Sequence, residues 1–208
     1  MDYPLFLLTS TSFLPACQSV SMALALGSWA SRASRIIGFM DEQAFWYIIA
    51  SSLEDGDSIE EQLSSLKQLL VAMPDEDLIA FQEMIDHMMM QAYRWGLWGA
   101  CYIMSGGCSD EMFEHFRAGL IMKGKDVYEA AVVQPDTLAD VGDIAECEDL
   151  LYLACEVYED RNDDGAIYDR FHEEGKATPD GDSFDEHDSR YLKQEYPRLW
   201  EIYCADKD

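Results

Sequence analysis

The chain has 208 residues, of which 49% are hydrophobic and 12% aromatic, and its net charge is −27 at pH 7. This apolar content suffices for one packed domain and excludes a disordered polyacid. A surface so negative repels nucleic-acid phosphates and anionic lipid headgroups, so we expect no binding to nucleic acid or membranes. The same field attracts basic proteins and cations, although acidity also serves solubility alone.

The charge changes abruptly near residue 40. Residues 1–39 hold a single acid, Asp2, against two arginines, whereas residues 40–208 hold 40 acids and 12 bases. A secretory or lipoprotein signal ending at Cys17, or an organellar transit peptide, would account for the first part, but the acidic start and an internal proline argue against a signal. We favour an upstream extension, such as one from a start codon assigned too early, and predict a single acidic domain over residues 40–208.

The six cysteines show no metal-binding or redox spacing. No pair has the C-x-x-C pattern, which argues against a zinc knuckle and a thioredoxin-type redox site. Cys147 and Cys155 are eight residues apart on one face of an expected helix, where a buried thiol behaves as a small hydrophobe. Reduced thiols are typical of the cytoplasm, which is the location we predict.

Three helices are expected in the first half of the domain. Asp41 can accept backbone N–H groups at a helix start, and Ser58 with Glu61 forms a capping box. Apolar residues recur at helical spacing after each cap, and two glycines inside the third run predict a kink or break near Trp95. The expected helices are 41–53, 58–73 and 75–104.

Three more helices are expected before residue 160. The pair Gly106-Gly107 ends the third run, and Ser109 caps the next helix with two acids in its first turn. The expected helices of this group are 109–123, 126–133 and 143–158. No segment alternates as a strand does. The sequence therefore predicts an all-α fold, a single-domain irregular bundle of about six to eight helices.

The last part of the chain divides into a polar loop and an aromatic segment. Residues 160–188 combine many acids with glycine and proline, which predicts a long acidic loop. Residues 191–203 are dense in tyrosine and tryptophan, and each such side chain removes about 150–250 Å² from water when it is buried. We therefore expect this C-terminal segment to dock on the domain.

Several blocks of the sequence together resemble a known bacterial family. They are Met40-Asp41 with Phe45-Trp46, Tyr93-Arg94-Trp95 with Leu97-Trp98, Gly106-Gly107-Cys108-Ser109-Asp110 with Phe113 and Phe116-Arg117, Glu146-Cys147-Glu148-Asp149-Leu150-Leu151-Tyr152, and Tyr196-Pro197-Arg198-Leu199-Trp200. The family is catalogued as domain of unknown function 4240, and the likeness covers residues 40–203. The resemblance implies a start at Met40 but brings no activity with it.

The central block is the candidate functional surface. Its members are Tyr93, Arg94, Trp95, Trp98, Gly106, Gly107, Cys108, Ser109, Asp110 and Arg117. Arginine can clamp an anion with two hydrogen bonds, and backbone N–H groups at a helix start attract the same charge. A purely structural interpretation competes with this one. In that interpretation Ser109 is only a cap, the indoles belong to the core, and the arginines pair with nearby acids.

No catalytic residue, cofactor or metal is assigned from the sequence. Cys108 could act as a nucleophile with His115 as base and Asp110 orienting it, but seven residues along a helix place His115 roughly 10 Å away, too far for direct hydrogen bonding. The four histidines lack the spacing of a zinc site. These observations argue against an enzyme without deciding the question.

One segment matches the opening of a calcium-binding loop. Asp160, Asn162 and Asp164 followed by Gly165 fit the first six positions of an EF-hand loop. The twelfth position should be a glutamate that supplies two oxygens, and it is Phe171. A solvated acidic loop is the competing interpretation.

Two classes of function remain after these exclusions. The first is a non-catalytic protein-interaction module with a basic partner, of which an immunity or inhibitor protein is one version. The second is a small-molecule binder or enzyme that uses the region from Trp98 to Arg117.

Overall fold

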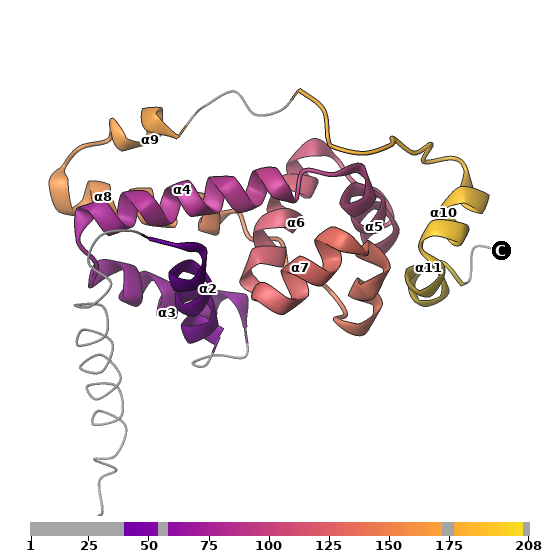
Figure 1. Ribbon diagram of the computed structural model, residues 1–208, viewed down its shortest axis with the longest axis horizontal. Helices are drawn as coiled ribbons and strands as arrows, with labels where there is room; N and C mark the ends of the chain where they lie inside the picture. The colour runs from indigo at the N-terminus through magenta and orange to yellow at the C-terminus, as the bar shows by residue number, and fades with distance from the viewer. Residues whose placement is uncertain (1–39, 54–57, 172–176, 206–208) are drawn as a thin grey trace, which may run out of the picture. The chain divides into compact units, whose positions relative to one another are not determined.

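A computed structural model describes residues 40–53, 58–171 and 177–205. The expected extension, residues 1–39 with Cys17, lies outside the described residues, as does the acidic stretch 54–57 expected to end the first helix. The described ranges hold helices and no strand, which confirms the all-α prediction (Figure 1). In chain order they are α2 (Glu42–Ser52), α3 (Ile59–Val71), α4 (Asp75–Gln91), α5 (Trp95–Ser105), α6 (Asp110–Met122), α7 (Lys125–Val133), the 3-10 helices η2 (Pro135–Asp140) and η3 (Asp149–Leu151), α8 (Leu153–Asn162), α9 (Ile167–Arg170), α10 (Ser189–Glu195) and α11 (Pro197–Tyr203).

The predicted N-terminal caps are present. The carboxylate of Asp41 accepts the backbone N–H of Ala44 at 2.8 Å, and the Ser58 hydroxyl accepts that of Glu61 at 3.2 Å. The Ser109 hydroxyl likewise accepts a backbone N–H three residues later, at 3.2 Å. Each cap satisfies a donor that the helix itself leaves without a partner, so these helix starts are fixed by local chemistry.

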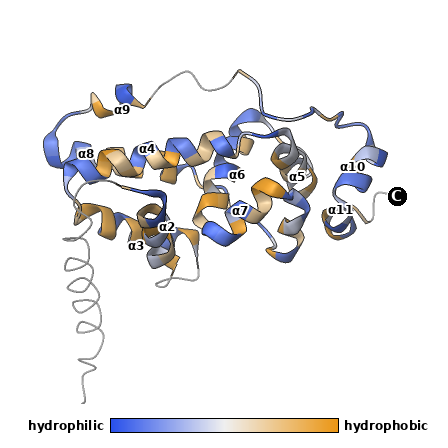
Figure 2. Ribbon diagram, in the orientation of Figure 1, coloured by the Kyte–Doolittle hydropathy of each residue, from blue (hydrophilic) through white to orange (hydrophobic). Residues whose placement is uncertain are grey.

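Helix α4 is the centre of the core. It packs against α2, α6 and α8, and Figure 1 shows α8 running beside it. Figure 2 shows hydrophobic and hydrophilic residues alternating along α4, as expected for a helix with one face in the core. The buried ring of Phe81 on α4 lies 5.2 Å from that of Phe45 on α2. Apolar burial of this kind supplies most of the stability of a helical domain.

The predicted break near Trp95 is confirmed, but its cause differs from the one expected. Helix α4 ends at Gln91 and α5 begins at Trp95, while the two glycines lie inside an intact α5. At the break, the backbone pairs with a distant residue, Asp180. The N–H of Trp95 donates to the carbonyl of Asp180 at 3.0 Å, and the N–H of Asp180 donates to the carbonyl of Tyr93 at 2.9 Å. A long-range contact therefore stabilises the break.

The helix expected over residues 143–158 is wrong in its first half. Residues 143–148 are irregular, and α8 begins only at Leu153. The N–H of Cys147 donates to the carbonyl of His115 on α6 at 3.1 Å instead of to a helical partner. The backbone of Ala145 lies so close to Gly119 of α6 that an added Cβ would come within 1.8 Å of the Ala145 carbonyl oxygen. Residues 143–148 therefore pack closely on α6 and do not form the expected helix.

The C-terminal segment docks on the domain as predicted. Helices α10 and α11 form this segment, and α11 packs on α5 and on η2, a 3-10 helix that was not predicted. The buried carboxylate of Asp136 in η2 accepts the backbone N–H groups of Arg198 and Leu199 at the start of α11. The hydroxyl of Tyr196 donates to the carbonyl of Gly96 on α5 at 2.9 Å. The expected acidic loop before it contains the short helix α9.

Candidate functional site

The aromatic residues of the central block form a continuous stack. Trp95 and Trp98 lie three residues apart on α5, and their ring centroids are 5.3 Å apart in a stacked arrangement. Trp98 also stacks on Phe113 of α6 at 4.7 Å, and Tyr93 lies 6.1 Å from the same phenylalanine. Phe184, from the segment before α10, meets Trp95 edge-on at 6.1 Å. The contact of Trp98 with Phe113 thus packs α5 against α6.

Arg117 on α6 closes the inner end of this stack. Its side chain is buried, and its guanidinium carbon lies 4.9 Å from the ring centroids of both Tyr93 and Phe113. Its Nη1 donates to the carbonyl of Met89 on α4 at 2.8 Å, and its Nε donates to the carbonyl of Phe113 at 3.2 Å. Burial lowers the pKa of Arg117, and the charge of nearby Glu114 opposes that effect. The cation thus joins α6 to α4 through carbonyl oxygens and rings.

The turn between α5 and α6 folds back onto α5. Gly106 and Gly107 have φ values of 70° and 152°, which side chains with a Cβ rarely adopt. The carbonyl of Cys108, the next residue, accepts the indole N–H of Trp98 at 3.2 Å. The sulfur of Cys108 lies 2.8 Å from that of Cys101 on α5. The thiol that was considered and not assigned as a nucleophile therefore has another thiol as its neighbour.

The structure brings some of the predicted site residues together and leaves others apart. Tyr93, Trp95, Trp98 and Arg117 share the stack described above, whereas Arg94 and Asp110 are exposed. The Nε of Arg94 donates to the carbonyl of Gln91 at 2.9 Å. Binding of a small molecule by this block stays an untested alternative.

A hollow of about 280 Å³ lies on the other side of α6, and the sequence interpretation did not single it out as a site. Its lining residues are Ile59, Glu60, Leu63, His115, Glu146, Cys147, Glu148 and Asp149. We call it the acidic hollow, because four of these residues are exposed carboxylates. They come from the start of α3 and from residues 146–149, which meet because the irregular segment packs on α6. A repeated pattern of acids at 146, 148 and 149 was the available signal.

Among the described residues, His115 is the only histidine that lines the acidic hollow, and it lies beside one of the four carboxylates. Its Nδ1 lies 4.0 Å from the carboxylate of Glu146, and its side chain is 14% exposed. At the start of α3, a backbone N–H and then the Ser58 hydroxyl hold the pKa of Glu60 below its usual value. His115 and Cys108 face different surroundings, so the cysteine–histidine pair considered from the sequence is not assembled.

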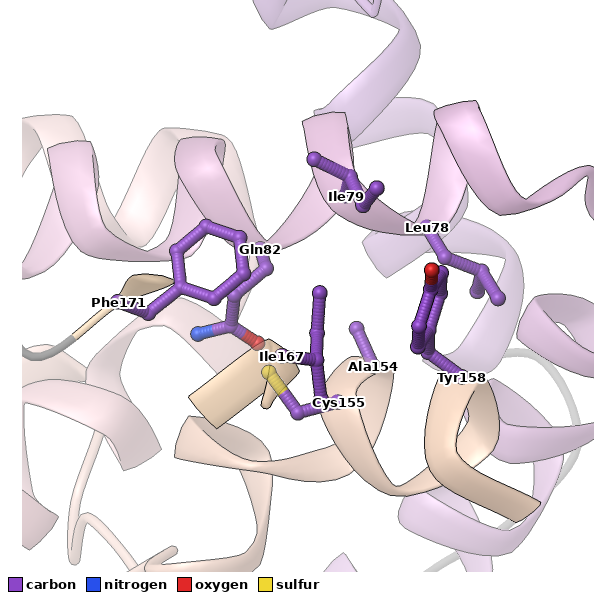
Figure 3. Close-up of a pocket in the computed structure, with 8 residues that line it drawn as sticks. All are labelled: Leu78, Ile79, Gln82, Ala154, Cys155, Tyr158, Ile167 and Phe171. Atoms are coloured by element: carbon purple, nitrogen blue, oxygen red, sulfur yellow. The ribbon is translucent and has the colours of Figure 1, made fainter. Parts of the chain in front are cut away.

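A second hollow lies between α4, α8 and α9 (Figure 3). It is lined by Leu78, Ile79, Gln82, Ala154, Cys155, Tyr158, Ile167 and Phe171, and these side chains leave no room for a water molecule. The amide nitrogen of Gln82 donates to the carbonyl of Leu151 at 2.9 Å, while its buried oxygen has no hydrogen-bond partner in the described part of the chain. Burial raises the pKa of Cys155 to about 11. This hollow is a packed apolar seam.

The segment that matches a calcium loop is divided between a helix and a turn. Asp160 and Asn162 belong to the last turn of α8, and the Asn162 amide donates to Asp75 and to the carbonyl of Tyr158. Asp164 accepts the backbone N–H of Ala166 at 3.1 Å. Within the described ranges, no group of three or more His, Cys, Asp or Glu side chains is placed to hold a metal ion. Calcium binding by this segment stays an untested alternative to a solvated acidic loop.

These features define an all-α, strongly acidic domain whose described residues include a partly exposed aromatic cluster and an open acidic hollow. None of the helices that the structure describes is both long and apolar enough to cross a membrane. Residues 40–160 match the family described as protein of unknown function (DUF4240), and the chain belongs to that family. This match confirms the resemblance seen in the sequence. No curated protein and no solved structure matches the chain.

Proposed function

We propose that residues 40–208 form a single, non-catalytic protein-interaction domain that binds a basic partner through the acidic hollow. The observation that carries the proposal is the gathering of four exposed carboxylates around His115 in one concave surface. The family match, which begins at residue 40, supports treating residues 1–39 as an extension outside this domain.

The distribution of basic residues supports the choice of this surface. Five of them form ion pairs elsewhere on the domain, and Arg117 is buried among carbonyls and rings. The pairs are Lys67 with Glu156, Lys125 with Glu42 and Glu129, Arg161 with Asp75, Arg170 with Glu83, and Arg198 with Asp140. Among the residues that the structure describes, no lysine or arginine lines the acidic hollow. Its negative charge is therefore available to a cation from outside.

The size of the hollow favours a side chain of a partner over a cofactor. Pockets for drug-sized ligands hold about 300–1,000 Å³ and are mostly apolar. The acidic hollow lies just below that range and is rimmed by charge, so it suits one or two lysine or arginine side chains. Complementary charge of this kind speeds association and makes binding sensitive to salt.

The finer form of the proposal is an inhibitor or immunity protein in the cytoplasm, whose acidic face covers a basic surface of its target. The alternative, a small-molecule or active site from Trp98 to Arg117, has less support. There the arginine already holds two carbonyl oxygens, and the indoles stack on each other and on Phe113.

Affinity purification with the full chain as bait tests the proposal. Proteins captured from the native cell are compared between the wild type, a hollow variant (Glu146→Gln, Glu148→Gln, Asp149→Asn) and a control variant. The control variant carries the same charge change at exposed acids in and before the C-terminal segment (Asp182→Asn, Glu195→Gln, Glu201→Gln). We expect a basic protein to be retained by the wild type and the control, and to be lost from the hollow variant and at high salt. Equal capture by both variants, or equal loss, would contradict a role for this surface.

A further inference from the structure

Cys101 and Cys108 form a thiol pair that is close to bonding distance. Their sulfurs lie 2.8 Å apart, whereas a disulfide bond measures about 2.05 Å. The seven-residue separation along the chain would not bring them together without the turn at Gly106 and Gly107, whose positive φ values direct the chain back over α5. A shift of less than about 1 Å would complete the bond.

The two thiols differ in access to solvent. Cys101 is fully buried on the inner face of α5, while Cys108 lies in the turn and is half-buried. The described cysteines outside this pair, Cys147, Cys155 and Cys204, are all buried. A small oxidant therefore reaches Cys108 first and meets Cys101 directly behind it. This order of exposed and resolving thiols is what reversible thiol oxidation requires.

We propose that Cys101 and Cys108 are a site of reversible oxidation by hydrogen peroxide. The Cys108 thiolate attacks one peroxide oxygen, the O–O bond breaks, and the hydroxide that leaves takes a proton to become water. The Cys101 sulfur then attacks the sulfenic sulfur of Cys108, the S–O bond breaks, and the hydroxyl leaves as water with the Cys101 proton. Two thiols and one peroxide give one disulfide and two waters, with two electrons passing from sulfur to peroxide.

The disulfide would fix the α5–α6 turn to α5. The same turn holds the Cys108 carbonyl that accepts the indole N–H of Trp98, so oxidation alters the surroundings of the aromatic stack. The acidic hollow lies on the other side of α6 and contains neither cysteine of the pair. Oxidation and partner binding therefore involve different residues, and each has its own measurement.

Peptide mapping of the full chain gives a direct test with an internal control. Trypsin cleavage after Arg94 and Arg117 yields peptide 95–117, which contains only Cys101 and Cys108, and cleavage after Lys125 and Arg161 yields peptide 126–161, which contains only Cys147 and Cys155. The chain is treated with hydrogen peroxide, unfolded, alkylated and digested without reductant. We expect peptide 95–117 to lose both alkylation sites and two hydrogens at least about tenfold faster than peptide 126–161, and dithiothreitol to restore them.

Two variants separate the roles of the thiols. Cys108→Ser changes a half-buried position and should leave Cys101 fully alkylated after peroxide. In Cys101→Ala, the sulfenic acid of Cys108 should accumulate and be trapped by dimedone. The proposal is overturned if peptide 95–117 of the wild type stays reduced at a peroxide concentration that oxidises peptide 126–161, if both react at the same rate, or if Cys108 passes to sulfinic acid without a disulfide.

Discussion

The two faces of helix α6 use charge in opposite ways. On one face, Phe113 and Arg117 turn toward α4 and α5, and the cation is buried between rings with carbonyl oxygens as its partners. On the other face, His115 lines a hollow whose four carboxylates are exposed. Helix α6 thus lies between a buried positive charge that stabilises the fold and exposed negative charges that other molecules can reach.

This difference shows how to tell a structural residue from a candidate binding residue. An arginine beside tryptophans suggests an anion site in the sequence, but a guanidinium whose donors are already used inside the fold contributes chiefly to stability. Acids scattered through an acidic chain suggest only solubility, but acids that the fold gathers around a concave surface without a basic neighbour can act on a partner. Four variants test this contrast.

Arg117→Ala should have the largest effect on stability. It removes the buried donors from the carbonyls of Met89 and Phe113 and the packing of the guanidinium on two rings, which together cost about 3 kcal/mol of the free energy of unfolding. Urea denaturation measures this change. Arg94→Ala is the matched control, because Arg94 is exposed and should change the same quantity by no more than about 0.5 kcal/mol. Equal effects of the two variants would show that Arg117 is not a structural cation.

Gly119→Ala should have the second largest effect on stability, because it disturbs the packing of residues 143–148 on α6. The new Cβ would lie 1.8 Å from the carbonyl oxygen of Ala145, and a backbone neighbour cannot move as a flexible side chain can. We expect a loss of about 2 kcal/mol and a displaced 143–148 segment. Gly96→Ala is the control with the opposite sign, because its Cβ would meet only Pro135 at 3.5 Å and alanine favours helix by up to about 1 kcal/mol. The two urea midpoints should therefore move in opposite directions.

Alkaline pH should destabilise the core through Tyr128, a buried residue of α7. Burial raises the pKa of this tyrosine above its ordinary value of 10.0, and its hydroxyl donates to the carbonyl of Met88 at 2.6 Å. The folded state keeps the proton that the unfolded chain releases, so this contribution is complete below pH 10 and is lost as pH rises further. Tyr128→Phe should cost about 1 kcal/mol at neutral pH and flatten the fall of the thermal midpoint above pH 10. An unchanged slope would contradict this assignment.

Neutralising the acidic hollow should have the smallest effect on stability. The three exposed acids of the hollow variant contribute less than about 0.5 kcal/mol to folding, since exposed charges are screened by water and salt. Thermal unfolding of the hollow variant and of its C-terminal control should therefore be alike, while their capture of a basic partner differs. A large loss of stability in the hollow variant alone would show that these acids stabilise the fold.

Features that depend on neighbours in sequence were predictable. The caps at Asp41, Ser58 and Ser109 form because each side chain reaches the first turn of its own helix, and the aromatic residues of 191–203 docked because so much apolar area cannot stay in water. The grouping of the central block was also visible, since Trp95 and Trp98 are neighbours on one helix face.

Features that depend on distant contacts were not predictable. The break between α4 and α5 is paired with Asp180, and the irregular segment 143–148 gives its Cys147 N–H to α6 although its apolar spacing matches a helix. The role of Arg117 rests on the carbonyl of Met89, 28 residues earlier. The acidic hollow exists only after α3 and residues 146–149 meet, so the acids at 146, 148 and 149 could suggest it but could not define it.

The contact of Tyr196 with α5 shows that the fold extends beyond the residues that match the family model. The family match ends at residue 160, yet a Cβ at Gly99 would lie 2.4 Å from the Tyr196 hydroxyl oxygen, so the ring rests directly on the backbone of α5. A fragment trimmed to the matched residues would leave this glycine surface bare and the Gly96 carbonyl without its tyrosine. The Tyr196 ring therefore requires a residue without a Cβ at position 99, almost a hundred residues earlier in the chain.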